Sequence, residues 1–319
     1  MGSSLTSSVL PLLVGGLVLF LYAIKNLSDT LRGMFSKKAE KMIARYTGNI
    51  FMAIGIGTLV TIVLDSSSAV IILVIIFINA GTLNFHQAMG IIMGANIGTT
   101  FSSQLIALSI GKYAVIPMVI GFVIWVFASA KYKKAGKLLL YFGMLFFGLH
   151  LLEISVAPLK GSDFLEERLL QINNPVTGAL AGGLITLIIQ SSSATMGMII
   201  VLSKQGFIQL GTALSVMLGA ELGTCSDTLL AVIGGRRDAV RAGVFHLIFN
   251  LVPILAGLLF FDYLVKMVSF ISGNAPLQRQ IANGHVLFSI LSVLMFLPFI
   301  KVFYRFLYWL IPEKKRQAV

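Results

Sequence analysis

Charged residues are scarce in this chain of 319 residues. Asp, Glu, Lys and Arg together make up 11% of it, whereas a typical soluble domain has about 25%. Apolar residues make up 57%, and the mean hydropathy is +0.94. This composition excludes an ordinary soluble domain and indicates an all-α polytopic membrane protein, with the lipid bilayer as its surroundings.

Acidic residues and cysteine are both few. The 12 Asp and Glu are outnumbered by 24 Lys and Arg, which gives a net charge of +12. In a membrane protein such an excess collects in cytoplasmic loops, so we expect no nucleic-acid partner. The single cysteine, Cys225, excludes a disulfide framework within the chain.

The chain does contain an internal duplication. Asp65-Ser66-Ser67-Ser68-Ala69 returns 125 residues later as Gln190-Ser191-Ser192-Ser193-Ala194. Residues 57–99 align without a gap on residues 182–224, with 14 identities in 43 positions. Most of the identical residues are small or hydroxylic. In an apolar chain such residues let backbones approach closely and hydrogen-bond ligands.

Each serine cluster lies between two apolar arms. The first pair of arms covers residues 48–64 and 69–78, and the second hairpin covers residues 176–203. At 1.5 Å per residue, arms of about 10 to 17 residues reach roughly 15 to 25 Å, which is less than the roughly 30 Å of a hydrocarbon core. We therefore expect two re-entrant hairpins with their tips near the middle of the membrane.

A longer apolar run follows each hairpin and is interrupted by polar residues. Residues 85–110 are interrupted at 94–100, and residues 207–233 at 219–224. This predicts a broken helix in each half, with Thr99, Thr100 and Thr224 where the second half-helix begins. The other expected spans are residues 11–24, 113–130, 138–152, 242–261 and 285–311.

The number of crossings predicts the topology. Three crossings and one returning hairpin make an odd number per half, so the second half enters the membrane in the opposite orientation. We expect inverted repeats at residues 1–137 and 138–261, then an extra C-terminal transmembrane helix and basic cytoplasmic tail at 262–319. With the N-terminus outside and the C-terminus cytoplasmic, 18 of the 24 basic residues lie on the cytoplasmic side. The basic stretch 25–45 fits a helix along the membrane surface.

Inverted repeats with discontinuous helices are the usual architecture of secondary transporters, with the site between the repeats. Serine hydroxyls before the second arm of a hairpin can cap a helix start and leave backbone N–H groups facing outward, which suits an oxyanion. The predicted anion-binding residues are Ser66, Ser67, Ser68, Ser191, Ser192, Ser193, Thr99, Thr100 and Thr224.

Hard oxygen ligands lie in the same segments. A carboxylate at bilayer depth costs about 2.5 to 3.5 kcal/mol, so Asp65 and Glu221 are expected to bind a cation, carry a proton or pair with a neighbouring helix. Oxygen ligands suit sodium rather than a transition metal. The predicted cation ligands are Asp65, Gln190, Asn96, Glu221, Thr61 and Thr186.

Several of these motifs together resemble the type II sodium/phosphate cotransporter family, in its short bacterial form. They are the two Ser-Ser-Ser-Ala clusters, Gly-Ala-Asn-Ile-Gly-Thr-Thr at 94–100, His246-Leu-Ile-Phe-Asn250, and Ala282-Asn283-Gly284-His285 with Phe288. The resemblance covers about residues 10–300. It implies sodium-driven uptake of inorganic phosphate across a bacterial plasma membrane, without an organic cofactor. It leaves a homodimer and a separate phosphate-regulatory protein open as partners.

The chain departs from the family pattern at three positions. Asp65 replaces a usual glutamine, and Glu221 and Ser289 each replace a usual asparagine. Added negative charge opposes phosphate unless cations or protons neutralise it. One alternative is therefore a proton-coupled or otherwise coupled transporter of another anion or an organophosphate.

An intramembrane hydrolase is the alternative from a different class. No Gly-x-Ser-x-Gly nucleophile elbow occurs in the sequence. Duplicated serine clusters fit a shared binding site better than one nucleophile with one base. The sequence therefore favours transport over catalysis.

Overall fold

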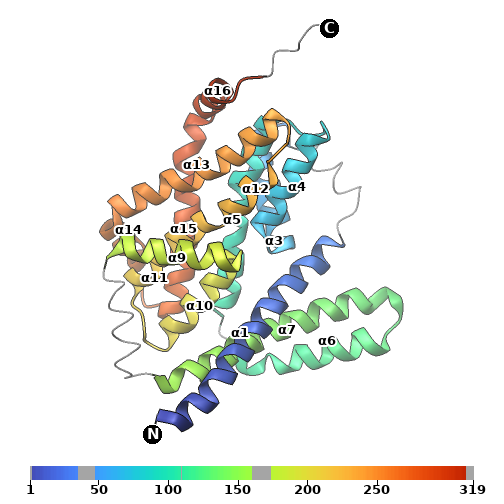
Figure 1. Ribbon diagram of the computed structural model, residues 1–319, viewed down its shortest axis with the longest axis vertical. Coiled ribbons are helices and arrows are strands. Elements are labelled where there is room, and N and C mark those ends of the chain that lie inside the picture. The colour runs from blue at the N-terminus through green and yellow to red at the C-terminus, as the bar shows by residue number, and fades with distance from the viewer. Residues whose placement is uncertain (1, 35–46, 109, 160–173, 314–319) are drawn as a thin grey trace.

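A computed structural model describes residues 2–34, 47–108, 110–159 and 174–313, and within these ranges all regular structure is helical (Figure 1). The predicted all-α class is confirmed. The α-helices are α1 (Gly2–Arg32), α3 (Ile50–Leu64), α4 (Ser67–Asn79), α5 (Phe85–Ile106), α6 (Val115–Phe127), α7 (Ala130–Val156), α9 (Pro175–Ile189), α10 (Ser192–Lys204), α11 (Leu210–Gly223), α12 (Cys225–Ala231), α13 (Arg237–Leu259), α14 (Phe261–Ser272), α15 (Leu277–Phe296) and α16 (Ile300–Leu310).

Four of the described helical segments are long and apolar enough to cross a bilayer. They are Val9–Leu31, Ala130–Val156, Arg237–Leu259 and Leu277–Leu310, the last of which joins α15 and α16. Helices α5 and α6, bent by 75° relative to each other, form a fifth candidate. The chain is a multi-pass membrane protein.

Both serine clusters lie at the tips of helical hairpins, as the sequence predicts. Helix α3 ends at Leu64 and α4 begins at Ser67; helix α9 ends at Ile189 and α10 begins at Ser192. How deeply these tips enter the membrane stays a prediction.

The predicted break in the first long helix is wrong. Helix α5 runs without interruption through residues 94–100. The hydroxyls of Thr99 and Thr100 donate to the carbonyls of Ala95 (3.0 Å) and Ile97 (2.8 Å), so these polar groups are satisfied inside the helix. In the second half a break does occur, since α11 ends at Gly223 and α12 begins at Cys225.

Glycines in α3, α5, α9 and α11 instead allow the first arm of each hairpin to pack closely on the long helix that follows. A Cβ at Gly57 would lie 2.3 Å from the carbonyl oxygen of Ile91, and one at Gly182 would lie 1.9 Å from that of Val216. A second pair of glycines 125 residues apart behaves in the same way. A Cβ at Gly94 would lie 2.0 Å from the carbonyl oxygen of Ile54, and one at Gly219 would lie 1.7 Å from that of Ala179. The two halves of the chain therefore repeat the same close helix packing as well as the same sequence motifs.

Several helix boundaries differ from the predicted ones. Helix α14 was not predicted, and the last span begins at Leu277, before the expected residue 285. Helix α1 continues to Arg32, into the basic stretch that was expected to lie on the membrane surface. The remainder of that stretch, residues 35–45, lies outside the described residues.

The helices bury two apolar clusters. Helix α7 packs along α1 and α6, at the lower right of Figure 1, while α3 packs on α5 and α9 on α11. One cluster centres on Phe20 of α1 and Phe146 of α7 and extends to α10, α11 and α15. The other centres on Phe85, Phe245 and Phe296 and joins α3, α4, α5, α13 and α16. Both hairpin tips line one cavity together with α1.

Candidate functional site

The two hairpin tips have the same unusual backbone. Asp65 (φ 52°, ψ 30°) and Gln190 (φ 61°, ψ 30°) are the non-glycine residues with positive φ in the described ranges. Their N–H groups donate to the carbonyls of Thr61 (2.8 Å) and Thr186 (2.7 Å) and so close the preceding helices. A non-glycine residue in this region costs roughly 1 to 2 kcal/mol. Such strain at equivalent positions of a repeat is typical of functional sites.

A serine caps the helix that follows each tip. The hydroxyls of Ser66 and Ser191 accept hydrogen bonds from the N–H groups of Ala69 and Ala194, both at 3.2 Å. The predicted capping role of these serines is confirmed. The remaining N–H groups of the first turn carry the partial positive charge of a helix start.

One cavity of about 570 Å³ brings the two tips together. Helix α1 forms its wall, and the Ser28 hydroxyl of α1 donates to the Leu64 carbonyl at the first tip (3.0 Å). The lining residues are Leu21, Ile24, Lys25, Ser28, Asp29, Asp65, Ser66, Ile188, Ile189, Gln190 and Ser191.

The contribution of α1 to this cavity was missed in the sequence. Its signal is local but weak: Lys25, Ser28 and Asp29 have the i, i+3, i+4 spacing of one helix face, at the end of an apolar span. The sequence interpretation assigned Lys25 to a membrane-surface segment, because nothing local relates α1 to the hairpin tips.

Asp65 also lines a second, water-sized cavity. Its volume is about 30 Å³, and its polar lining residues are Asp65, Ser102 and Ser193. The Ser102 hydroxyl donates a hydrogen bond to Oδ1 of Asp65. A cavity of this size holds one or two particles as small as water. Asp65 thus lines both the wide cavity and a narrow one whose other lining residues are mostly apolar.

The contacts between the two halves are reciprocal. Ser68 of the first hairpin lies near Asp227 of α12, and its equivalent, Ser193, shares the narrow cavity with Ser102 of α5. Ser102 is itself the equivalent of Asp227 at the offset of 125 residues. In agreement, α4 packs on α12 and α10 packs on α5. Each hairpin therefore lies against the other half of the chain.

Glu221 lies in a buried chain of hydrogen bonds apart from both cavities. Its Oε1 is 3.1 Å from Nε2 of His285, and Nδ1 of His285 is 2.8 Å from the hydroxyl of Ser103. The exposed fractions are 4% for Glu221 and 0% for His285 and Ser103. Of the alternatives for this carboxylate, the structure shows a pair with a neighbouring helix; its role as a cation ligand stays a prediction.

The other predicted site residues line neither of these two cavities. The amide of Asn96 donates to the Ile92 carbonyl (3.0 Å), and the Thr224 hydroxyl donates to the Glu221 carbonyl (2.9 Å). Ser67 and Ser192 are buried in the first turns of α4 and α10. Thr99 and Thr100 bond within α5, as described above.

Thr61 and Thr186 occupy equivalent positions but differ in hydrogen bonding. The Thr186 hydroxyl is 2.7 Å from the hydroxyl of Thr195. The Thr61 hydroxyl is buried and has no hydrogen-bond partner among the described residues, because the position equivalent to Thr195 is Val70. An unpaired buried hydroxyl costs about 1 to 3 kcal/mol.

This difference gives a stability prediction. In sodium-free detergent solution, Thr61→Val is expected to raise the free energy of unfolding by about 1 kcal/mol, because it removes an unpaired hydroxyl. The matched variant Thr186→Val is expected to lower it by about 1 kcal/mol, because it leaves Thr195 without that partner. Thermal unfolding of the purified proteins measures both. Equal losses in the two variants would contradict the unpaired state of Thr61.

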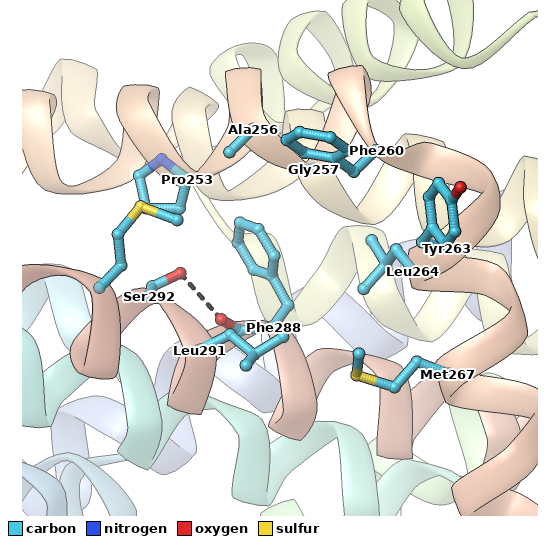
Figure 2. Close-up of a pocket in the computed structure, with 11 residues that line it drawn as sticks. Pro253, Ala256, Gly257, Phe260, Tyr263, Leu264, Met267, Phe288, Leu291 and Ser292 are labelled. Atoms are coloured by element: carbon cyan, nitrogen blue, oxygen red, sulfur yellow. Dashed lines mark hydrogen bonds between the residues drawn. The ribbon is translucent and has the colours of Figure 1, made fainter.

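A further cavity has a different character. It measures about 180 Å³ and lies between α13, α14 and α15 (Figure 2). Phe260, Met267 and Phe288 are among its mostly apolar lining residues, and the Ser292 hydroxyl donates to the Phe288 carbonyl (2.8 Å). With no charged side chain in its lining, this cavity does not suit an ion.

Comparison with known proteins adds three relatives. YqeW of Bacillus subtilis (strain 168) is 30% identical over 300 residues, which are 93% of this chain and 97% of that protein. The "Putative inorganic phosphate export protein YjbB" of Escherichia coli (strain K12) is 25% identical over 280 residues, or 86% of this chain and 49% of that protein. Sodium-dependent phosphate transport protein 2A of Rattus norvegicus is 31% identical over 90 residues, or 26% of this chain and 14% of that protein.

The chain thus spans about half the length of YjbB and a small part of the rat protein. No solved structure matches it significantly. The Na+/Pi-cotransporter family matches residues 19–154 and 161–297, which include α3 to α6, most of α7 and all of α9 to α15, and with them both hairpin tips. This match, together with the near full-length similarity to YqeW, shows that the chain belongs to the Na+/Pi-cotransporter family.

Proposed function

We propose that the protein is a sodium-coupled symporter of inorganic phosphate that works by alternating access. The observation that carries the proposal is the cavity of about 570 Å³ lined by both hairpin tips. It joins two capped helix starts and a carboxylate in one space. The names of YjbB and of the rat protein, which refer to phosphate export and to sodium-dependent phosphate transport, support this substrate and coupling ion.

Phosphate would bind between the helix starts of α4 and α10. Ser66 and Ser191 line the cavity and cap these helices, and N–H groups at a helix start attract an oxyanion. Ser67, Ser68, Ser192 and Ser193 follow in the same first turns. Thr99, Thr100 and Thr224 are left out of this proposal, since their hydroxyls bond within helices.

Sodium would bind at the narrow cavity beside Asp65. A carboxylate with hydroxyls nearby is a set of hard oxygen ligands, and Asp65, Ser102 and Ser193 supply these groups. Gln190 lies at the equivalent tip and lines the wide cavity. The unpaired Thr61 hydroxyl, one helical turn before Asp65, is a further oxygen available to a cation. Asn96 and Glu221 bond elsewhere and are not part of this set.

We infer further that the two repeats are inverted. Reciprocal contacts of α4 with α12 and of α10 with α5 are those of two halves related by an approximate two-fold axis. With the odd number of crossings per half that the sequence predicts, that axis would lie in the membrane plane, as in other secondary transporters. The excess of basic residues in alternate loops supports a cytoplasmic C-terminus and insertion in a bacterial plasma membrane.

Proton coupling is the second candidate function. It is favoured by one observation, the buried pair of Glu221 and His285. Buried acidic and histidine side chains that contact one another form proton relays in pumps and transporters. Ser102 and Ser103 are adjacent on α5 and bond to Asp65 and His285, respectively. A proton on this pair would thus lie next to the residues around the tip.

The hydrogen-bonded chain of Ser103, His285 and Glu221 does not support hydrolysis. Ser103, His285 and Glu221 have the hydroxyl, imidazole and carboxylate of a hydrolase triad. However, Ser103 and His285 are fully buried and line neither cavity described above. A nucleophile needs space for a substrate carbonyl beside it, so we infer a structural or proton-binding role.

The test is uptake of radiolabelled phosphate into proteoliposomes. Phosphate uptake that requires an inward sodium gradient at constant pH would support the symporter. Uptake driven equally well by an inward proton gradient in sodium-free buffer would support the second candidate instead. Absence of phosphate uptake under either gradient would reject phosphate as the substrate, and protein-free liposomes give the background.

A further inference from the structure

We propose that Lys25 of α1 binds the charged oxygen atoms of the transported anion, so that α1 forms part of the substrate site. This inference rests on the proposed transport of phosphate, and it adds a residue that lies outside both serine motifs. Its starting point is position: Lys25 lines the same cavity as Ser66 and Ser191, which cap the two helix starts.

Among the described residues that line this cavity, Lys25 is the single basic one. Its side chain is exposed, and no carboxylate of the described residues lies within ion-pair distance of it. Other basic side chains near buried regions are paired: Lys204 lies 2.7 Å from Glu153, and Arg241 lies 2.5 Å from Asp238. Lys25 thus has a full positive charge available to a ligand.

The charge balance of the cavity requires such a group. Asp29 and Asp65 also line the cavity and together carry two negative charges when ionised. The two helix starts supply roughly half a positive charge each, or about one in total. Without Lys25 the lining is net negative by about one charge and repels an anion. With Lys25 it is close to neutral, so a bound cation makes it attractive to phosphate.

The chemistry of lysine fits a site that must also release its ligand. A lysine ammonium is a compact charge on a flexible stem, whereas an arginine holds phosphate through two fixed, parallel hydrogen bonds. Leu21 and Ile24 of α1 line the cavity together with Lys25. On its flexible stem the ammonium can follow the anion within the cavity.

The experiment removes the positive charge of Lys25 and then restores it chemically. In Lys25→Cys, the Michaelis constant for phosphate is expected to rise about tenfold or more, as expected for loss of a charged hydrogen bond. Reaction with aminoethyl methanethiosulfonate rebuilds a cationic side chain and should restore most of the affinity. Sulfonatoethyl methanethiosulfonate, which adds a negative charge, should not. The native Cys225 is 2% exposed and has little access to either reagent.

Lys266→Cys is the matched control. Lys266 is an exposed lysine of α14 that lines none of the cavities described above, so its substitution and labelling should leave the Michaelis constant unchanged. An unchanged constant in Lys25→Cys, or equal recovery with both reagents, would overturn the inference. Equal recovery would mean that Lys25 acts by filling space.

A second readout separates this inference from the proposed function. Inorganic phosphate and sulfate are tested for their ability to slow the labelling of Lys25→Cys in membranes. If wild-type protein takes up no phosphate, the proposed function fails; slowing by sulfate then still supports an anion at Lys25. Labelling that neither anion slows would overturn the inference even if wild-type uptake is sodium-dependent.

Discussion

Asp65→Asn is expected to raise the half-saturating sodium concentration for phosphate uptake by about tenfold or more. The substitution keeps the size of the side chain and an oxygen acceptor for Ser102, and Asn tolerates the left-handed backbone as Asp does. It removes the negative charge that lines both cavities. A loss of about 1.4 kcal/mol in cation binding is tenfold in affinity, and charged interactions in partly buried sites commonly exceed that amount.

Initial rates of phosphate uptake at varied sodium, with phosphate held constant, measure this effect. Asp262→Asn is the matched control, since Asp262 is an exposed carboxylate of α14 outside the cavities described above. Both variants should elute from size-exclusion chromatography like the wild type. A sodium dependence that is the same in Asp65→Asn and wild type would remove Asp65 from the cation path.

Gly219→Ala is expected to prevent stable packing of α9 on α11. The added Cβ would lie 1.7 Å from the carbonyl oxygen of Ala179, and a backbone atom cannot move aside as a flexible side chain does. Overpacking of a tight core costs about 1 to 3 kcal/mol and sometimes more; we expect the upper end of this range or beyond. Gly94→Ala, at the equivalent position, should behave in the same way, since its Cβ would lie 2.0 Å from the Ile54 carbonyl oxygen.

Gly183→Ala and Gly55→Ala are the controls for this prediction. A Cβ at Gly183 would lie 3.4 Å from its nearest neighbour, and one at Gly55 would have nothing within 4 Å. Both variants should unfold at or above the wild-type temperature, because alanine favours the helix over glycine by about 1 kcal/mol. Similar midpoints for Gly219→Ala and Gly183→Ala would mean that α9 and α11 can separate without cost.

The hairpin tips could be predicted from sequence because their signals are local. A serine before an apolar run caps the helix that begins there, and both Ser66 and Ser191 do so. The continuity of α5 could not be predicted in this way. Residues 94–100 carry the small and polar residues of a helix break, and their role as a packing surface depends on the approach of α3.

The cavity wall and the Glu221 pair needed the tertiary structure. Lys25 and Asp29 are 36 or more residues from the first tip that they face. Glu221 and His285 were each singled out in the sequence, but they are 64 residues apart and meet through the packing of α11 on α15. Periodicity and motif spacing describe one helix at a time, so they cannot predict contacts between helices that are distant in the sequence.

The matched backbones of Asp65 and Gln190 have a consequence for the transport cycle. Two tips with the same geometry but different side chains differ by one unit of charge. If the repeats are inverted as we propose, one tip belongs to the inward-opening movement and the other to the outward-opening one. The cation then travels with a single half of the protein, and the membrane voltage acts unequally on the two movements. A structure that is nearly symmetric in shape would therefore be electrically polar, so the rates of the two movements would depend differently on the membrane voltage.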